Sequence, residues 1–244
     1  MADDSPLACF QVALKEYLNS PNFSDVTIRC EGEDFKAHRL VLCAQSKWFF
    51  KACNGDWKEA TERVIDLPDD KLPVVEAMLD FFYRFDYQAT SSPMIFNAKV
   101  YSIADKYDIP TLKSHALGKF RKSVETCWGM DDFPLAIREV YSSTLDNDRG
   151  LRDLVVKAAC EHADALSKEP EFRTALEEAS SFAADVVLSM AKGRPKQTTP
   201  RTNTYDCPNC GNSWQAILPS GISCYCPNCG NSRSNWDSYI TARA

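Results

Sequence analysis

Residues 24–53 read SDVTIRCEGEDFKAHRLVLCAQSKWFFKAC, and the structure of the N-terminal half can be predicted outward from them. DVTIRC at 25–30 alternates and is rich in β-branched residues, EGED at 31–34 is a turn sequence, and FKAH follows at 35–38. This pattern predicts a β-hairpin. HRLVLCAQSKWFFKAC at 38–53 is predicted as one helix directly after it.

Helical patterns continue on both sides of this stretch. LACFQVALKEYL at 7–18 has the apolar spacing of an amphipathic helix, which NSPNFSD at 19–25 ends. VIDL at 64–67 is short, apolar and flanked by charge and proline, as expected of a core strand. Three more helices are predicted from KLPVVEAMLDFFYRF (71–85), IFNAKVYSIADKYDI (95–109) and LKSHALGKF (112–120). The order of helix, hairpin, helices, strand and helices indicates an α+β domain.

This order, with particular residues in it, resembles the BTB/POZ domain. The matching stretches are SDVTI, FKAHRLVLCAQSKWFFKAC, VIDLPDD, VEAMLDFFYRFDY and IADKYDIPTLK, and we assign the domain to residues 1–120. The resemblance implies a three-stranded sheet capped by helices, used for dimerisation and partner docking and without known catalysis. It also implies a homodimer in which the helix at 7–18 packs against its counterpart.

The resemblance draws attention to the loop NGDWKEATERVIDL at 54–67. In BTB domains this loop can carry an apolar-x-Glu motif that contacts cullin scaffolds of ubiquitin ligases, and Trp57 and Glu59 match the motif. A large aromatic residue beside an acid is a plausible anchor for a groove on a partner. The alternative interpretation is that Trp57 covers the core of its own domain.

Residues 121–191 carry four further helical signals, in FPLAIREVYSS, RGLRDLVVKAACEHADAL, EPEFRTALEEA and SFAADVVLSMAK. Pro170 is expected in the first turn of its helix. One helix face is predicted from Leu151, Leu154, Val155, Ala158, Ala159 and His162. The segment resembles the all-helical extension that often follows a BTB domain; the alternative is that it only packs against that domain.

The charge of the chain changes near residue 191. Residues 1–190 hold 22 Lys and Arg against 32 Asp and Glu, whereas residues 191–244 hold 6 against 2. An acidic body is poorly suited to phosphate contacts. The basic segment 192–204 is predicted as a linker, and Lys192, Arg194 and Lys196 in it resemble the core of an AT-hook, which lies in the minor groove of DNA.

Five of the eleven cysteines lie in the last 40 residues. The heptapeptide CPNCGNS occurs at 207–213 and again at 226–232, which places Cys207, Cys210, Cys226 and Cys229 in the spacing C-x2-C-x15-C-x2-C. Four thiolates on two facing turns are the ligand set of a structural Zn²⁺ site, and the glycine of each CPNCG is expected to have a positive φ. Residues 205–244 thus resemble a zinc ribbon.

Other interpretations of these cysteines are weaker. Cys224 competes with Cys226 as a ligand, but the repeat favours Cys226. A redox role for CPNC requires a helix after the first cysteine, and Gly-Asn-Ser argues against one. A closed four-cysteine site leaves no open position for catalysis, and the few apolar residues of 201–244 predict that this segment folds only with its metal.

No signal sequence, membrane span or known catalytic motif is apparent, so we expect a protein of the cytoplasm or nucleus that is not an enzyme. The sequence favours a protein-protein interaction adaptor that dimerises and recruits substrates to a cullin ubiquitin ligase. The alternative is a chromatin-associated regulator that contacts DNA through the linker and ribbon.

Overall fold

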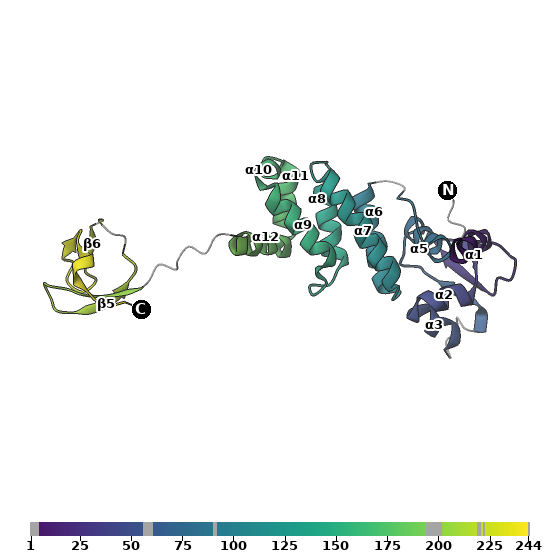
Figure 1. Cartoon of the computed structure of the whole chain (residues 1–244), viewed down its shortest axis with the longest axis horizontal. Coiled ribbons are helices and arrows are strands. Elements are labelled where there is room, and N and C mark those ends of the chain that lie inside the picture. Colours follow the sequence, from purple (N-terminus) through teal and green to yellow (C-terminus); the bar gives the residue numbers. More distant parts are fainter. Residues whose placement is uncertain are drawn as a thin grey trace. The chain divides into compact units, whose positions relative to one another are not determined.

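The computed structural model describes residues 5–55, 61–89, 92–193, 202–218, 221 and 223–243. The chain divides into two compact units, Met1–Met190 and Ala191–Ala244 (Figure 1). Among the helices of the described ranges, none combines the length and the apolar character that a bilayer crossing requires.

The N-terminal unit is built on a small mixed sheet. Strands β1 (Val26–Cys30), β2 (Glu33–Ala37) and β3 (Val64–Asp66) are arranged in the order β2-β1-β3. The hairpin β1–β2 is antiparallel, as the sequence predicts, whereas β3 pairs with β1 in parallel and places Ile65 beside Ile28. Both isoleucines are fully buried, so one face of the sheet contributes directly to the core.

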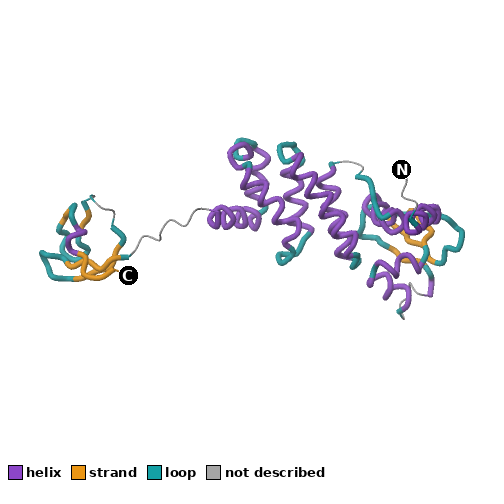
Figure 2. Tube along the Cα trace, in the orientation of Figure 1, coloured by secondary structure: helices purple, strands orange, loops and turns teal. Residues whose placement is uncertain are grey.

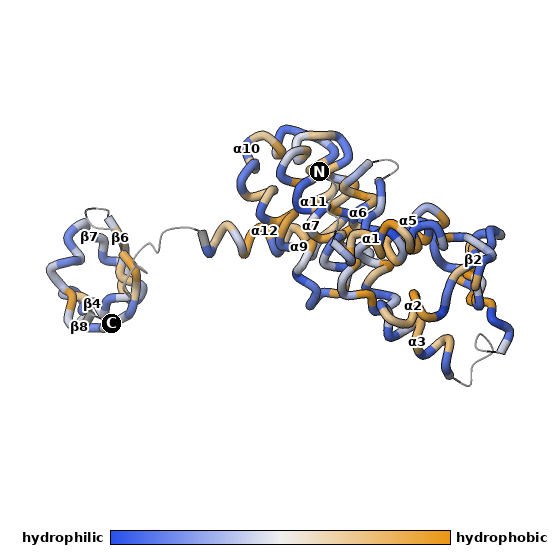
Figure 3. The backbone as a smooth tube through the Cα atoms, turned by 45° about the vertical axis from the view of Figure 1, so that its right-hand side comes forward, coloured by the Kyte–Doolittle hydropathy of each residue, from blue (hydrophilic) through white to orange (hydrophobic). Residues whose placement is uncertain are grey.

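Helices surround this sheet, as Figure 2 shows. The first is α1 (Pro6–Leu14), which continues as a 3-10 turn over Lys15–Tyr17. The others are α2 (Arg39–Gln45), α3 (Lys47–Asn54), α5 (Leu72–Arg84), α6 (Pro93–Lys106) and α7 (Pro110–Cys127). The central helix is α5, in which eight of thirteen residues are buried, and Figure 3 shows hydrophobic residues concentrated along it.

The prediction of one helix over 38–53 is wrong, because the chain breaks at Ser46 into α2 and α3. Ser46 has an extended backbone, and its hydroxyl oxygen accepts a hydrogen bond from the amide of Phe49 at 3.0 Å. The same hydroxyl donates to the carbonyl of Tyr107 at 2.5 Å. Serine is a strong N-cap residue, so these local bonds compete successfully with a continuous helix.

The helical extension consists of α8 (Phe133–Ser143), α9 (Arg149–Glu161), α10 (Ala163–Leu166), α11 (Pro170–Glu178) and α12 (Ser180–Gly193). Pro170 opens α11, as predicted. The predicted face of α9 is confirmed: four of its six residues are buried, Leu154 is partly buried, and His162 stacks on Trp128 with 3.6 Å between ring centroids.

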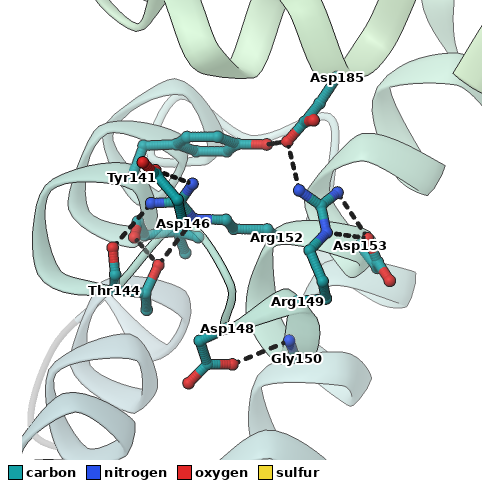
Figure 4. Close-up of polar contacts among 10 residues, drawn as sticks. Tyr141, Thr144, Asp146, Asp148, Arg149, Gly150, Arg152, Asp153 and Asp185 are labelled. Atoms are coloured by element: carbon teal, nitrogen blue, oxygen red, sulfur yellow. Dashed lines mark hydrogen bonds and ion pairs between the residues drawn. The ribbon is translucent and has the colours of Figure 1, made fainter. Parts of the chain in front are cut away.

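Partly buried polar contacts hold α12 to α8 and α9 (Figure 4). The carboxylate of Asp185 accepts hydrogen bonds from the hydroxyl of Tyr141 on α8 and from the guanidinium of Arg149 on α9, both at 2.7 Å. Arg152 is 3% exposed, and its guanidinium lies over the Tyr141 ring. Burial, followed by the bond to Asp185, raises the pKa of Tyr141, so the hydroxyl remains a donor.

The C-terminal unit contains a three-stranded antiparallel sheet, in the order β5-β4-β8, and a separate hairpin. Its strands are β4 (Asn203–Asp206), β5 (Ser213–Ala216), β6 (Cys224–Tyr225), β7 (Ser232–Arg233) and β8 (Ile240–Arg243). Tyr205 and Trp236 form a small core beside two cysteines, and the Trp236 indole donates to the carbonyl of Cys224 at 2.8 Å.

Candidate metal centre and apolar groove

The two CPNCG sequences form matching turns. In each turn the glycine amide donates to the carbonyl of the first cysteine, at 2.8 Å in one and 2.9 Å in the other. The amide of that cysteine donates to the carbonyl of the asparagine five residues later, at 3.0 and 2.9 Å. Gly211 and Gly230 both have φ 71°, which confirms the predicted positive φ. The identical peptides therefore adopt one backbone conformation twice.

These turns bring four sulfur atoms together. The Sγ atoms of Cys207, Cys210, Cys226 and Cys229 lie within 4.8 Å of one another. The Cys207–Cys229 pair is 3.7 Å apart and the Cys210–Cys226 pair 3.8 Å. A tetrahedral site with zinc-sulfur bonds of about 2.3 Å has sulfur-sulfur edges of about 3.8 Å. The four thiols thus fit a metal ion, and both measured separations are too long for a disulfide.

Hydrogen bonds to sulfur favour the ionised form at two of these cysteines. The side-chain amide of Asn209 donates to the Cys229 thiol at 3.5 Å and, with the Asn231 amide, lowers the pKa of Cys229 to about 6. Burial opposes ionisation of Cys207, but amide donors still lower its pKa. At Cys210 one backbone amide favours the thiolate, yet burial and the neighbouring thiols raise the pKa to about 11. A bound cation would favour the thiolate form of Cys210 as well, because the cation compensates the charge of adjacent thiolates.

The other predicted site residues lie apart from this cluster. Cys224 is in β6, and its sulfur is not among the four that lie together. Trp57, Glu59, Arg194 and Lys196 lie outside the described residues. Lys192 is exposed in the last turn of α12, so this helix, like β4 at the other end, extends into the segment predicted as a linker.

A second candidate site is an apolar groove in the N-terminal unit, which sequence reasoning did not find. It has a volume of about 550 Å³ and is lined by Phe10, Leu14, Tyr17, Phe23, Asp25, His38, Leu40, Val41, Ala44, Gln45 and Phe85. None of the residues of α1 is buried, although Leu7, Phe10 and Val12 are apolar. The sequence offers two indirect signals: the resemblance implies that the helix at 7–18 packs against its counterpart, and apolar residues occur on more than one side of this helix.

The side chains of His38 and Asp25 in the groove are already hydrogen-bonded within the chain. Nε2 of His38 lies 2.9 Å from the carbonyl of Asn22, which can only accept, so this nitrogen carries the proton. Nδ1 of His38 then accepts from the hydroxyl of Tyr83, also at 2.9 Å. Asp25 accepts from the Arg39 amide at 2.8 Å. The groove is therefore chemically suited to an apolar occupant.

Comparisons with known proteins agree on the N-terminal unit. Residues 14–123 match the family model of the BTB/POZ domain. Human Kelch repeat and BTB domain-containing protein 4 is 34% identical over 102 residues, which cover 42% of this chain and 18% of that protein. A putative BTB/POZ domain-containing protein of Arabidopsis thaliana is 25% identical over 195 residues, covering 77% of this chain and 90% of the relative.

Among solved structures, the BTB domain of human gigaxonin aligns with a TM-score of 0.38 at 19% identity, covering 48% of this chain and 93% of that one. The chain spans less than a fifth of the length of the Kelch-repeat relatives that it matches. The matched segment includes all three strands of the N-terminal sheet and most of α7. Residues 14–123 of this chain are therefore a BTB/POZ domain.

Proposed function

We propose that this protein is a non-catalytic adaptor of the cytoplasm or nucleus. It forms a homodimer through its BTB/POZ domain and presents a zinc-stabilised C-terminal unit to another protein. The observation that carries the proposal is the exposed apolar face formed by α1 and the groove beside it. An enzyme site would instead need convergent reactive groups, and His38 and Asp25 of this groove bond to the chain itself.

The size of the apolar face supports a homodimer. Phe10 and Leu7 on α1 are 58% and 65% exposed, and Leu40 and Phe23 beside the groove are 82% and 85% exposed. A whole aromatic side chain covers about 150–250 Å², so the exposed parts of Phe10 and Phe23 alone amount to about 210–360 Å², to which the exposed leucines add. The largest patch on a typical monomer covers about 300–600 Å² and is often functional, so an apolar surface of this size marks a contact site.

Sedimentation velocity tests the homodimer. We expect the intact chain, whose monomer is 27.4 kDa, to sediment as a dimer at micromolar concentration. Phe10→Glu places a charge on the apolar face and should yield a folded monomer. Leu145→Glu is the matched control, since Leu145 is 69% exposed in the helical extension. A wild-type chain that remains monomeric would reject this part of the proposal.

The four-cysteine centre supports a structural zinc ion. Cys₄ is a preferred zinc ligand set, and all four positions of a tetrahedron are filled by Cys207, Cys210, Cys226 and Cys229, so the ion would join the two turns without an open position. Residues 202–243 of the sequence carry few charges, with Asp206, Arg233 and Asp237 among them. A low charge favours contact with a protein over contact with phosphate.

Recruitment of a cullin is the second step of the adaptor role. Its support is the match of Trp57 and Glu59 to the apolar-x-Glu motif of BTB domains, between α3 and β3 in the sequence. Trp57→Ala combined with Glu59→Ala should abolish cullin co-purification and leave thermal stability near the wild-type value. If Trp57 only covers the core, the double variant will be less stable and will still recover cullin.

DNA binding is a second candidate function, favoured by the net positive charge of residues 191–244 and by Lys192, Arg194 and Lys196. The acidic charge of residues 1–190 opposes it. If DNA is the target, retention on A·T-rich DNA will fall steeply with added salt and disappear in Arg194→Ala. Weak retention that is unchanged in this variant would leave only the adaptor role.

A further inference from the structure

The segment Pro21–Ser24, between α1 and β1, is a tight turn with an unexpected residue in it. The amide of Ser24 donates to the carbonyl of Pro21 at 3.3 Å, which closes the turn. Phe23 occupies the third position and has φ 60°. Turns with a positive φ at this position favour Gly or Asn, and a bulky residue in the left-handed region is a genuine outlier.

The surrounding chain fixes this conformation. The side-chain oxygen of Asn19 accepts from the amide of Lys36 at 2.9 Å. The carbonyl of Asn22 contacts the ring of His38, also at 2.9 Å. After the turn, the amide of Asp25 donates to the carbonyl of Ala37 at 3.2 Å. Bonds to β2 and to the start of α2 thus hold the turn from both sides, which is the condition under which a strained residue persists.

Packing within the chain does not explain the phenyl ring. Phe23 is 85% exposed, more than any other large hydrophobic side chain among the described residues. Its nearest aromatic neighbour is Tyr17, with 6.4 Å between the ring centroids. The side chain therefore combines an unfavourable backbone conformation with an unfavourable exposure. Such a combination is expected at functional positions, where a residue departs from the backbone and burial preferences of its type.

The position of Phe23 indicates what its exposed ring binds. Phe23 and Leu40 lie at the groove, so one surface carries both an apolar hollow and exposed apolar side chains. A surface with both features is self-complementary, as a two-fold symmetric interface requires. The groove's Gln45 also bonds within the chain, to the carbonyls of Val41 and Phe82, as His38 and Asp25 do to their own partners.

We propose that Phe23 is the preorganised anchor of the homodimer, and that the ring from each copy inserts into the apolar groove of the other. The inference rests on the dimerisation proposed above and adds the residue that determines its affinity. A rigid turn loses little conformational freedom on binding, so an anchor held in place before contact binds more tightly than a mobile one. Aromatic residues at the centre of an interface are typical of such anchors.

Dilution experiments on the full chain test the anchor. Phe23→Ala removes the ring from both copies at once, so we expect the dimer dissociation constant to rise at least 30-fold, towards about 1000-fold. Leu145→Ala, which removes another exposed apolar side chain, 69% exposed in the helical extension, should change it less than three-fold. A wild-type dimer that Phe23→Ala weakens less than three-fold overturns the anchor and leaves dimerisation intact. A monomeric wild type overturns both.

Phe23→Gly separates anchoring from a merely structural role. Glycine adopts φ 60° without strain. We therefore expect this variant to dissociate as readily as Phe23→Ala and, at concentrations where both are monomers, to have the higher melting temperature. If Phe23 instead stabilised its own domain, both variants would melt below the wild-type monomer. That result would overturn the proposal.

Discussion

Replacement of a single cysteine in the C-terminal unit tests whether this unit needs a metal ion to remain folded. Among the described residues of this unit, Tyr205 and Trp236 are the large side chains that are almost fully buried. At about 1.5–3 kcal/mol for each buried side chain, they contribute about 3–6 kcal/mol. A structural zinc site contributes roughly 10–16 kcal/mol. The metal should therefore dominate the stability, and Cys226→Ser should unfold this unit while the BTB/POZ domain remains folded.

The matched control lies two residues away. Cys224→Ser makes the same chemical change in β6, but its sulfur lies outside the four-sulfur group, and its carbonyl can still accept from Trp236. Elemental analysis should find one zinc per chain in wild type and in Cys224→Ser, and none in Cys226→Ser. Amide hydrogen exchange of β4 should be slow in the first two proteins and fast in the third. Retention of zinc and of slow exchange by Cys226→Ser would refute the argument.

Two further predictions concern the BTB/POZ domain. Ser46→Ala removes the cap of the Phe49 amide and leaves the buried carbonyl of Tyr107 without its donor, so urea denaturation should show a loss of about 2–4 kcal/mol; a loss below about 0.5 kcal/mol would contradict the role of the cap. Although burial opposes it, the bond from Lys119 helps lower the pKa of Asp86 to about 2, from an ordinary 3.8. The ionised carboxylate of Asp86 therefore stabilises the folded state fully at pH values above the pKa of Asp86 in the unfolded chain. This stabilisation is lost as the pH falls through about 2. Asp86→Asn should be less stable than wild type at pH 7 and should approach it as the pH falls below about 2; a difference that does not depend on pH would exclude this account.

The sequence predicted the features that repeat or alternate. The period of DVTIRC, the apolar face of α9 and the duplicated CPNCGNS each follow from local rules, and the structure confirms the strand, the helix face and the positive φ of both glycines. Ser46 was missed because a serine inside an apolar pattern looks like an exposed helix position until a partner for its hydroxyl, here Tyr107 from 61 residues away, is known.

The groove and Phe23 could not be predicted for a different reason. Periodicity shows which residues of α1 share a face, but not which face remains uncovered when the chain has folded. The letters PNFSD indicate a break between elements and do not reveal that Phe23 is held at positive φ. Exposure depends on what the rest of the chain covers, and a single sequence does not contain that information.

The parallel pairing of β3 with β1 has a consequence for the order of folding. β1 and β2 are joined by a two-residue turn and can meet early, whereas Ile65 must reach Ile28 across a 37-residue separation that includes α2 and α3. Closing such a loop costs entropy before its contacts form. We therefore expect the hairpin to form first and the last strand to dock late, so that changes in β3 accelerate unfolding more than they slow refolding.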